Sequence, residues 1–162
     1  MLDWADPLRL SEYRQSPRGQ GIYIIGRPGD PDRPIEVSKG YDPYMGRWPE
    51  NLFPLYVGIS ESMGRGVRSR LSLHARKKGN RCIAQHIDKG TSLWFVTISS
   101  TGMANFEALY LCLQSGEQFE CNVRSELERS AKRLRTEVRA DLTQSELDYY
   151  DNLDMGEHGE GM

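Results

Sequence analysis

The fold is decided by two short stretches, Gly21-Ile22-Tyr23-Ile24-Ile25-Gly26 and Phe53-Pro54-Leu55-Tyr56-Val57-Gly58-Ile59-Ser60. Both consist mainly of β-branched and aromatic residues and contain a glycine at or near the end, which is typical of buried strands that end at turns. A third run, Leu93-Trp94-Phe95-Val96-Thr97-Ile98 within 92–99, is apolar on both faces, as expected for a strand that helices cover on each side. These stretches predict a small three-stranded sheet.

The remaining sequence has mostly helical patterns. Five segments are predicted to be helices: 64–78, 81–90, 103–114, 125–140 and 143–153. We expect the first to end at Gly79-Asn80, as at a C-cap, and the second to stop at Gly90. The last begins with the capping box Thr143-Gln144-Ser145-Glu146. Residues 1–19 are interpreted as a peripheral lead-in with one helical turn, and the whole pattern predicts an α/β chain of the α+β type.

The chain has 162 residues, which corresponds to about one domain, predicted here as 1–153. The Gly- and Glu-rich tail 154–162 is predicted to be disordered and acidic. No stretch approaches the roughly 18 consecutive apolar residues of a membrane span, and the N-terminus does not resemble a signal peptide. The sequence therefore predicts a cytoplasmic protein without a membrane segment.

Two further features concern the loops and the cysteines. Residues 27–52 form a long Gly/Pro-rich insertion between the tyrosine stretches, and its aromatic residues favour an ordered excursion: Tyr41, Tyr44 and Trp48. The three cysteines show neither CxxC nor Cys/His zinc spacing, so we expect buried thiols: Cys82, Cys112 and Cys121.

Charge is distributed unevenly along the chain. The net charge is −2, but residues 141–162 hold seven of the 23 acidic residues and none of the 21 basic ones, so residues 1–140 are basic. Segment 65–81 contains seven basic residues and no acid. Such a run is either a solvated helix face or a nucleic-acid contact surface. Six of its residues are predicted to contact nucleic acid: Arg65, Arg68, Arg76, Lys77, Lys78 and Arg81.

Five residues could carry chemistry together. Glu107 is an acid in an otherwise apolar helical segment, where it needs a partner or a metal ion such as Mg²⁺. Arg70 could clamp a phosphate group, and His74, one helical turn later, could relay a proton or orient a tyrosine. Tyr23 and Tyr56 become useful bases only where neighbouring groups stabilise a phenolate. Each residue alone also has an ordinary structural explanation.

The order of these motifs resembles the GIY-YIG nuclease family. The resemblance covers about residues 20–122 and implies a three-stranded antiparallel sheet flanked by helices, followed here by additional C-terminal helices at 125–153. The family's site residues match, one by one, the following positions: Tyr23, Tyr56, Arg70, His74 and Glu107. Asn122 is similar in placement to an asparagine that often completes the site.

The resemblance implies hydrolysis of a DNA phosphodiester with one divalent ion, Mg²⁺ or Mn²⁺, on Glu107. One tyrosine, with Tyr23 as the first choice, would help to deprotonate the attacking water, while Arg70 would neutralise the phosphate. The 32 residues between Tyr23 and Tyr56 depart from the short hairpin that is typical of the family. The insertion at 27–52 would contact DNA or a second subunit, or fold over the site.

The leading hypothesis is a compact restriction-type or mobile-element endonuclease, as a homodimer if both strands of a duplex are cut. Helix 125–140 would then grip phosphates, or it would be a solvated packing helix. One alternative is a catalytically silent module of the same fold that binds nucleic acid or protein. Another is a regulatory protein whose acidic tail mimics DNA or docks a basic partner.

Overall fold

The computed structural model describes residues 4–37, 47–60, 64–99, 109, 113 and 118–122. Several predicted features lie outside these residues: Glu107, most of helix 103–114, helices 125–140 and 143–153, the tail, Cys112, and Tyr41 and Tyr44 of the insertion. The described part is mixed α+β. No helix within it is long and apolar enough to cross a membrane.

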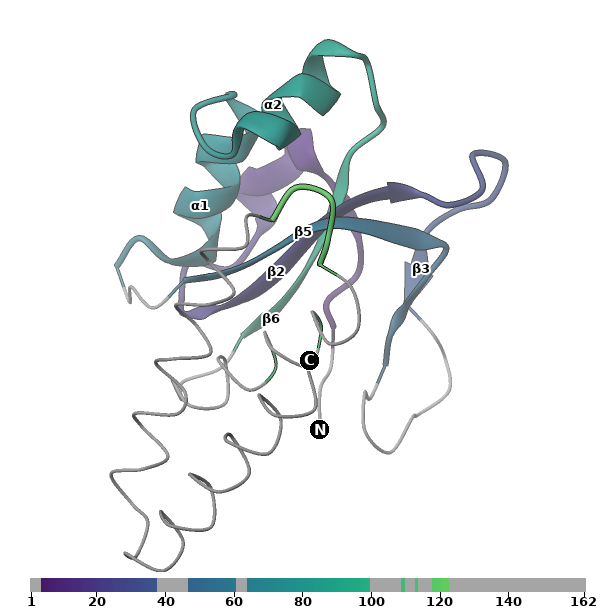
Figure 1. The fold of residues 1–162 in the computed structure, drawn as a ribbon. Helices are drawn as coiled ribbons and strands as arrows, with labels where there is room; N and C mark the ends of the chain where they lie inside the picture. Colours follow the sequence, from purple (N-terminus) through teal and green to yellow (C-terminus); the bar gives the residue numbers. More distant parts are fainter. Residues whose placement is uncertain are drawn as a thin grey trace, which may run out of the picture.

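A four-stranded antiparallel sheet forms the centre of the fold (Figure 1). Its order is β1 (Leu8–Arg9), β6 (Trp94–Ser99), β2 (Gly21–Pro28) and β5 (Leu52–Ser60). The three strands predicted from the sequence are confirmed. The sheet nevertheless has one strand more than expected, because the two-residue β1 pairs with the start of β6. A strand this short has no periodic pattern from which it could be recognised.

The two faces of the sheet carry separate apolar clusters. On one face, Tyr23, Ile25 and Phe95 pack with buried residues of the helices. On the opposite face, Ile22, Ile24 and other strand residues pack with Trp4, Leu109 and Leu113. This alternation follows from the two-residue period of a strand. The expectation that the strands are covered on both sides is therefore confirmed for the described residues.

Helices α1 (Gly66–Ala75) and α2 (Arg81–Asp88) lie together on one side of the sheet, as Figure 1 shows. The start of α1 is held by the lead-in, because Pro17 and Gly19 offer carbonyls to the N–H groups of Arg68 and Val67 at 3.1 Å each. These bonds satisfy donors that a helix N-terminus leaves unpaired. The predicted helical turn is present as the 3-10 helix η1 (Leu10–Gln15).

Two expectations about these segments were wrong. The lead-in is not peripheral, since Trp4 and Leu10 are buried in the two clusters. Helix α1 ends three residues earlier than predicted, because Lys77 adopts a left-handed conformation with φ of 60°. The N–H groups of Lys78 and Gly79 then turn back to the carbonyl of Leu73. The predicted stop of α2 before Gly90 is confirmed.

The described ends of the insertion are ordered. Strands β3 (Glu36–Val37) and β4 (Pro49–Glu50) pair with each other. Asn51 ties the preceding turn together, since its side chain accepts from the N–H of Asp30 at 2.7 Å and donates to the carbonyl of Arg33 at 2.8 Å. Trp48 packs edge-on against Trp4 at 5.5 Å between ring centroids. This tryptophan therefore supports the core.

Cys82 and Cys121 form a disulfide across 39 residues of sequence, so the expectation of free thiols was wrong for this pair. The sequence could not show that Cys121 lies at the edge of β5, next to a register shift in that strand. Ile25 pairs with Tyr56 but Gly26 pairs with Pro54, which leaves Leu55 outside the ladder. The carbonyl of Leu55 accepts from the N–H of Cys121 at 2.8 Å. This bond holds Cys121 beside α2.

Candidate functional site

A buried hydrogen bond joins Tyr23 on β2 to His74 on α1. The phenol oxygen of Tyr23 lies 2.9 Å from Nε2 of His74, and the two residues are 2% and 5% exposed. Gly58 stands opposite Tyr23 in the neighbouring strand β5. A Cβ at Gly58 would lie 2.3 Å from Cζ of Tyr23, so only glycine leaves room for this ring.

The hydrogen bonds around His74 determine its tautomer. The backbone N–H of Asn80 donates to Nδ1 of His74 at 3.1 Å, so Nδ1 has no proton. In a neutral imidazole the proton is then on Nε2, which donates to the oxygen of Tyr23. Burial, and secondarily the positive charge of Arg70, lowers the pKa of His74 from 6.5 to about 4. His74 is therefore uncharged at neutral pH.

Tyr56 completes a cluster of three rings, which we call the aromatic cluster: Tyr23, Tyr56 and His74. The ring centroid of Tyr56 lies 5.0 Å from that of His74 and 6.1 Å from that of Tyr23. Asn122 is hydrogen-bonded to β5, the strand that carries Tyr56. The Asn122 amide accepts from the N–H of Val57 and donates to its carbonyl, both at 2.9 Å. Asn122 thus fixes the backbone of Val57, the residue that follows Tyr56 in β5.

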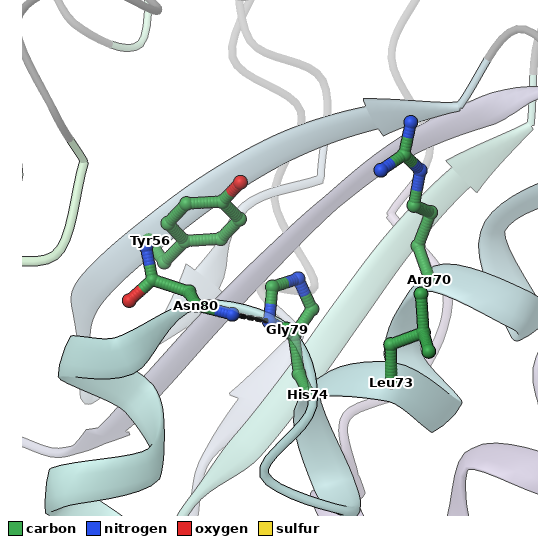
Figure 2. A pocket seen from close by; sticks show the side chains of 6 residues that line it. All are labelled: Tyr56, Arg70, Leu73, His74, Gly79 and Asn80. Carbon is green, nitrogen blue, oxygen red and sulfur yellow. Dashed lines mark hydrogen bonds between the residues drawn. The ribbon is translucent and has the colours of Figure 1, made fainter.

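A cavity of about 210 Å³ opens beside the aromatic cluster. It is lined by six residues: Tyr56, Arg70, Leu73, His74, Gly79 and Asn80. Figure 2 shows the phenol oxygen of Tyr56 and the guanidinium of Arg70 on the same open side of this cavity, with the imidazole of His74 between them. Arg70 is exposed, and it forms no ion pair with any described acidic residue. Its charge is therefore available to an anion in the cavity.

The turn after α1 contributes two residues, Gly79 and Asn80, that the sequence analysis named only as the end of the first helix. Gly79 is needed because a Cβ there would lie 2.6 Å from Nδ1 of His74. Asn80 caps α2 by accepting from the N–H of Ile83 at 3.0 Å, and its own backbone N–H fixes His74. An asparagine directly before a helical pattern is an N-cap signal, so Asn80 could have been recognised from the sequence as a cap.

Four of the five predicted site residues therefore lie together: Tyr23, Tyr56, Arg70 and His74. The fifth, Glu107, lies outside the described residues. Of the six residues predicted to contact nucleic acid, all are exposed except Arg68. Arg68 donates to the carbonyl of Ser16 at 2.7 Å, and Lys77 forms an ion pair with Asp88 at 2.9 Å. These two side chains have structural contacts that the charge pattern did not reveal.

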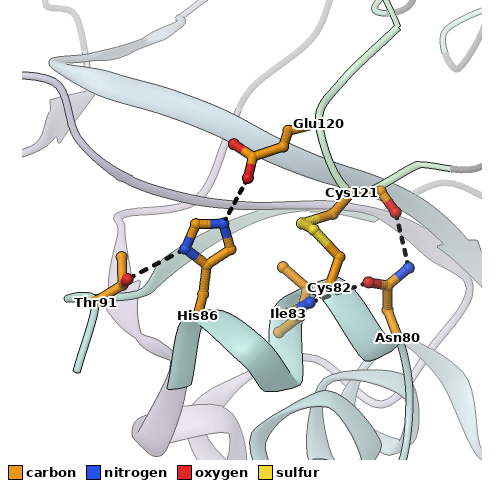
Figure 3. A network of polar contacts seen from close by, with 7 residues as sticks. All are labelled: Asn80, Cys82, Ile83, His86, Thr91, Glu120 and Cys121. Carbon is orange, nitrogen blue, oxygen red and sulfur yellow. Dashed lines mark hydrogen bonds and ion pairs between the residues drawn. A yellow bond between two sulfur atoms is a disulfide. The ribbon is translucent and has the colours of Figure 1, made fainter. Parts of the chain in front are cut away.

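A second polar cluster lies between α2 and the segment 118–122, and we call it the cysteine cluster: Cys82, His86, Glu120 and Cys121 (Figure 3). Each residue offers one potential metal-ligand atom, and these atoms lie within 4.8 Å of one another, although the two cysteines are joined as a disulfide. The sequence analysis found no Cys/His zinc spacing. Cys82 and His86 are four residues apart and therefore lie on one face of a helix. This spacing is the signal that the sequence analysis missed.

Comparison of this chain with known proteins finds no matching family model, no matching curated protein and no matching solved structure. The resemblance to GIY-YIG nucleases therefore rests on the sequence motifs alone.

Proposed function

We propose that this protein is a metal-dependent DNA endonuclease of the GIY-YIG type. One observation carries the proposal: Tyr56, His74 and the exposed Arg70 line one cavity, and Tyr23 is hydrogen-bonded to His74 behind it. Strands β2 and β5 and helix α1 supply these groups. A phosphodiester in this cavity would meet a cation, a phenol and a neutral imidazole together.

Arg70 would bind the scissile phosphate. Its guanidinium is planar, keeps its charge and presents several donors, which suits the charge that increases on phosphate oxygens in the transition state. Its position one helical turn before His74 directs it into the same cavity. Because His74 is uncharged, no buried positive charge lies beside the exposed guanidinium of Arg70.

The two tyrosines would have different tasks. Tyr56 lines the cavity, so its phenol can meet the attacking water or the phosphate directly. Tyr23 is almost fully buried, and its oxygen receives a hydrogen bond from Nε2 of His74. A donor aimed at that oxygen stabilises negative charge on it. This geometry favours Tyr56 as the residue nearest the reacting atoms, with the Tyr23–His74 pair behind it, which revises the preference for Tyr23 from the sequence.

The metal ion of the family needs a carboxylate. Among the described residues that line the cavity none is acidic, so these residues alone do not fit a magnesium site. Glu107 would have to complete it. When bound there, Mg²⁺ or Mn²⁺ would stabilise negative charge on phosphate oxygens.

Exposed cations continue from the cavity along the turn between the helices. Lys78 and Arg81 directly flank the cavity residues Gly79 and Asn80. Arg76, also exposed, is held in place by Ser72, whose hydroxyl lies 3.1 Å from its Nε. Phosphate contacts of this kind position a duplex without reading its sequence. We therefore propose DNA as the substrate and this turn as part of its contact surface.

The experiment is cleavage of supercoiled plasmid by purified protein with magnesium, with EDTA, and with the variants Glu107→Ala and Glu120→Ala. We expect nicking or linearisation that requires the metal, disappears in folded Glu107→Ala and persists in Glu120→Ala. Intact DNA binding without cleavage by the wild-type protein would instead establish the catalytically silent binding module. Cleavage that survives in Glu107→Ala would contradict the assignment of the metal to this residue.

A further inference from the structure

The cysteine cluster is distinct from the cavity around Arg70 and contains a different set of ligand atoms. Cys82 and His86 project from α2, one turn apart (Figure 3). Glu120 and Cys121 belong to the segment 118–122, which lies beside the edge of β5. Nε2 of His86 already lies 2.9 Å from a carboxylate oxygen of Glu120. Two sulfurs, one imidazole and one carboxylate are thus gathered from two elements.

We propose that the reduced form of this chain binds one thiophilic divalent cation, with Zn²⁺ as the representative ion, through Cys82, His86, Glu120 and Cys121. The ligands would be the two Sγ atoms, Nε2 of His86 and one carboxylate oxygen of Glu120. The disulfide form of the pair excludes the ion. The site is therefore occupied in one redox state and closed in the other.

The distances fit tetrahedral coordination after small side-chain adjustments. Zinc bonds of about 2.3 Å to sulfur and about 2.0 Å to nitrogen or oxygen place tetrahedral ligands roughly 3.3 to 3.8 Å apart. The four ligand atoms lie within 4.8 Å of one another. Opening the disulfide lets the two sulfurs separate, and rotation of the side chains brings the other pairs closer.

The surroundings orient the ligands as in established metal sites. Nδ1 of His86 lies 3.1 Å from the hydroxyl of Thr91, so this nitrogen can donate while Nε2 faces the ion. The carbonyl of Cys121 accepts from the side-chain amide of Asn80 at 2.8 Å, and its N–H donates to Leu55. Glu120 is exposed, which leaves an open side through which an ion can enter. These contacts fix the positions of the ligands on both elements.

The donor set determines the class of ion. Thiolate and imidazole ligands favour zinc and related soft or borderline ions, whereas Mg²⁺ prefers oxygen ligands. The cysteine cluster would therefore not hold the magnesium ion that the proposed nuclease requires. The two proposals concern different residues and different ions, and neither depends on the other.

The change between the two states is a balanced two-electron reaction. A dithiol reductant transfers two electrons and two protons to the Cys82–Cys121 disulfide, which breaks the S–S bond and leaves two thiols, while the reductant becomes a disulfide. Binding of the divalent cation then releases the two thiol protons. Reoxidation by a disulfide oxidant reverses both steps and expels the ion.

The first test compares the two redox states of the full-length wild-type chain, so that no substitution can impair folding. Protein reduced with a phosphine and protein left oxidised are each titrated with cobalt chloride and then with zinc chloride. We expect the reduced chain to bind one Co²⁺ with the absorption bands of a tetrahedral thiolate complex, and zinc to displace it. The oxidised chain should show none of these absorption bands. Absence of a stoichiometric cobalt complex in the reduced chain would overturn the proposal.

Variants identify the ligands. In reduced protein, Cys82→Ser and His86→Ala should each weaken cobalt binding by more than about 100-fold, and Thr91→Val, which removes only the orienting hydroxyl, by about 10-fold. Cys112→Ser is the matched control, since it removes the third cysteine and should bind cobalt like the wild type. Binding that is unchanged in Cys82→Ser but lost in Cys112→Ser would refute the assignment.

A chemical readout gives an independent answer. Zinc should protect Cys82 and Cys121 from an alkylating reagent in reduced protein, as mass spectrometry of peptides would show. The protection should disappear when zinc is removed with a chelator. Equal alkylation of both cysteines with and without zinc would contradict the site.

Discussion

The aromatic cluster and the cysteine cluster both contact Asn80, but they are held in different ways. Tyr23, Tyr56 and His74 are buried between the sheet and α1. The ligand atoms of the cysteine cluster lie between α2 and a short segment, and the Glu120 side chain is 54% exposed. Asn80 contacts both, through its backbone N–H to His74 and its side chain to Cys121.

The geometry of the aromatic cluster is therefore fixed by packing, whereas the geometry of the cysteine cluster can change when its disulfide is reduced. Moving a ring of the aromatic cluster would require rearrangement of the core, because interiors are close-packed. The cysteine cluster can open or close with one covalent bond, while the backbone contacts of Cys121 stay in place. We therefore expect substitutions in the first region to change stability or cleavage, and substitutions in the second to change ion binding.

The largest effect is predicted for Arg70→Ala. Removing a charged donor that acts mainly in the transition state should slow plasmid cleavage by about 100- to 1,000-fold. DNA affinity should fall far less, because the exposed cations of the turn remain. Single-turnover cleavage and a binding titration on the same DNA measure the two effects separately.

The matched control is Arg76→Ala, which removes an exposed arginine from the end of the same helix. It should weaken binding slightly and leave the single-turnover rate of bound DNA unchanged. If Arg70→Ala reduced binding and cleavage by the same factor, Arg70 would be a contact residue without a special role in the transition state.

Much of this comparison could be predicted from the sequence. The strands around Tyr23 and Tyr56 follow from dense β-branched and aromatic residues, and the spacing of Arg70 and His74 follows from the helical period. The cysteine cluster could not be predicted, because it depends on tertiary contacts that place Cys121 beside α2: bonds to the carbonyl of Leu55, at a one-residue bulge in β5, and to the side chain of Asn80. A bulge is set by tertiary contacts, and the sequence pattern of β5 continues through it.

The next effect tests how tightly the aromatic cluster is packed. Gly58→Ala would place a methyl group 2.3 Å from Cζ of Tyr23, so the ring or the strand must shift. We expect a loss of about 1–3 kcal/mol in the free energy of unfolding, measured by urea denaturation. Gly19→Ala is the control, because nothing lies within 4 Å of the added Cβ. Equal stability of the two variants would show that the ring of Tyr23 does not pack against Gly58.

Lowering the pH should reduce the free energy of unfolding by a comparable amount. The pKa of His74 is lowered from 6.5 to about 4 in the folded protein, mainly by burial. The unfolded chain therefore takes up this proton first as pH falls, and stability is lost between about pH 6.5 and about pH 4. Between about pH 7.5 and about pH 5, His74 should account for a loss of about 2 kcal/mol.

Urea denaturation of wild-type protein and His74→Gln at both pH values isolates this contribution. Glutamine does not titrate, so the variant should lose about 2 kcal/mol less than the wild type over the same range. Identical pH dependence of the two proteins would mean that His74 is accessible to protons in the folded state and is not the buried neutral donor to Tyr23.

The smallest effect concerns Asn80, where the two regions meet. Asn80→Ala removes the cap of α2 and the side-chain bond to Cys121, and should cost about 1 kcal/mol in the free energy of unfolding. Asn80→Ser keeps a capping oxygen but is too short to reach the carbonyl of Cys121, so most of the stability should return. If the cysteine cluster depends on that bond, both variants should weaken cobalt binding by the reduced chain, whereas only Asn80→Ala should lose stability. Serine behaving like wild type in both measurements would mean that Asn80 acts as a helix cap alone and that the two clusters are independent.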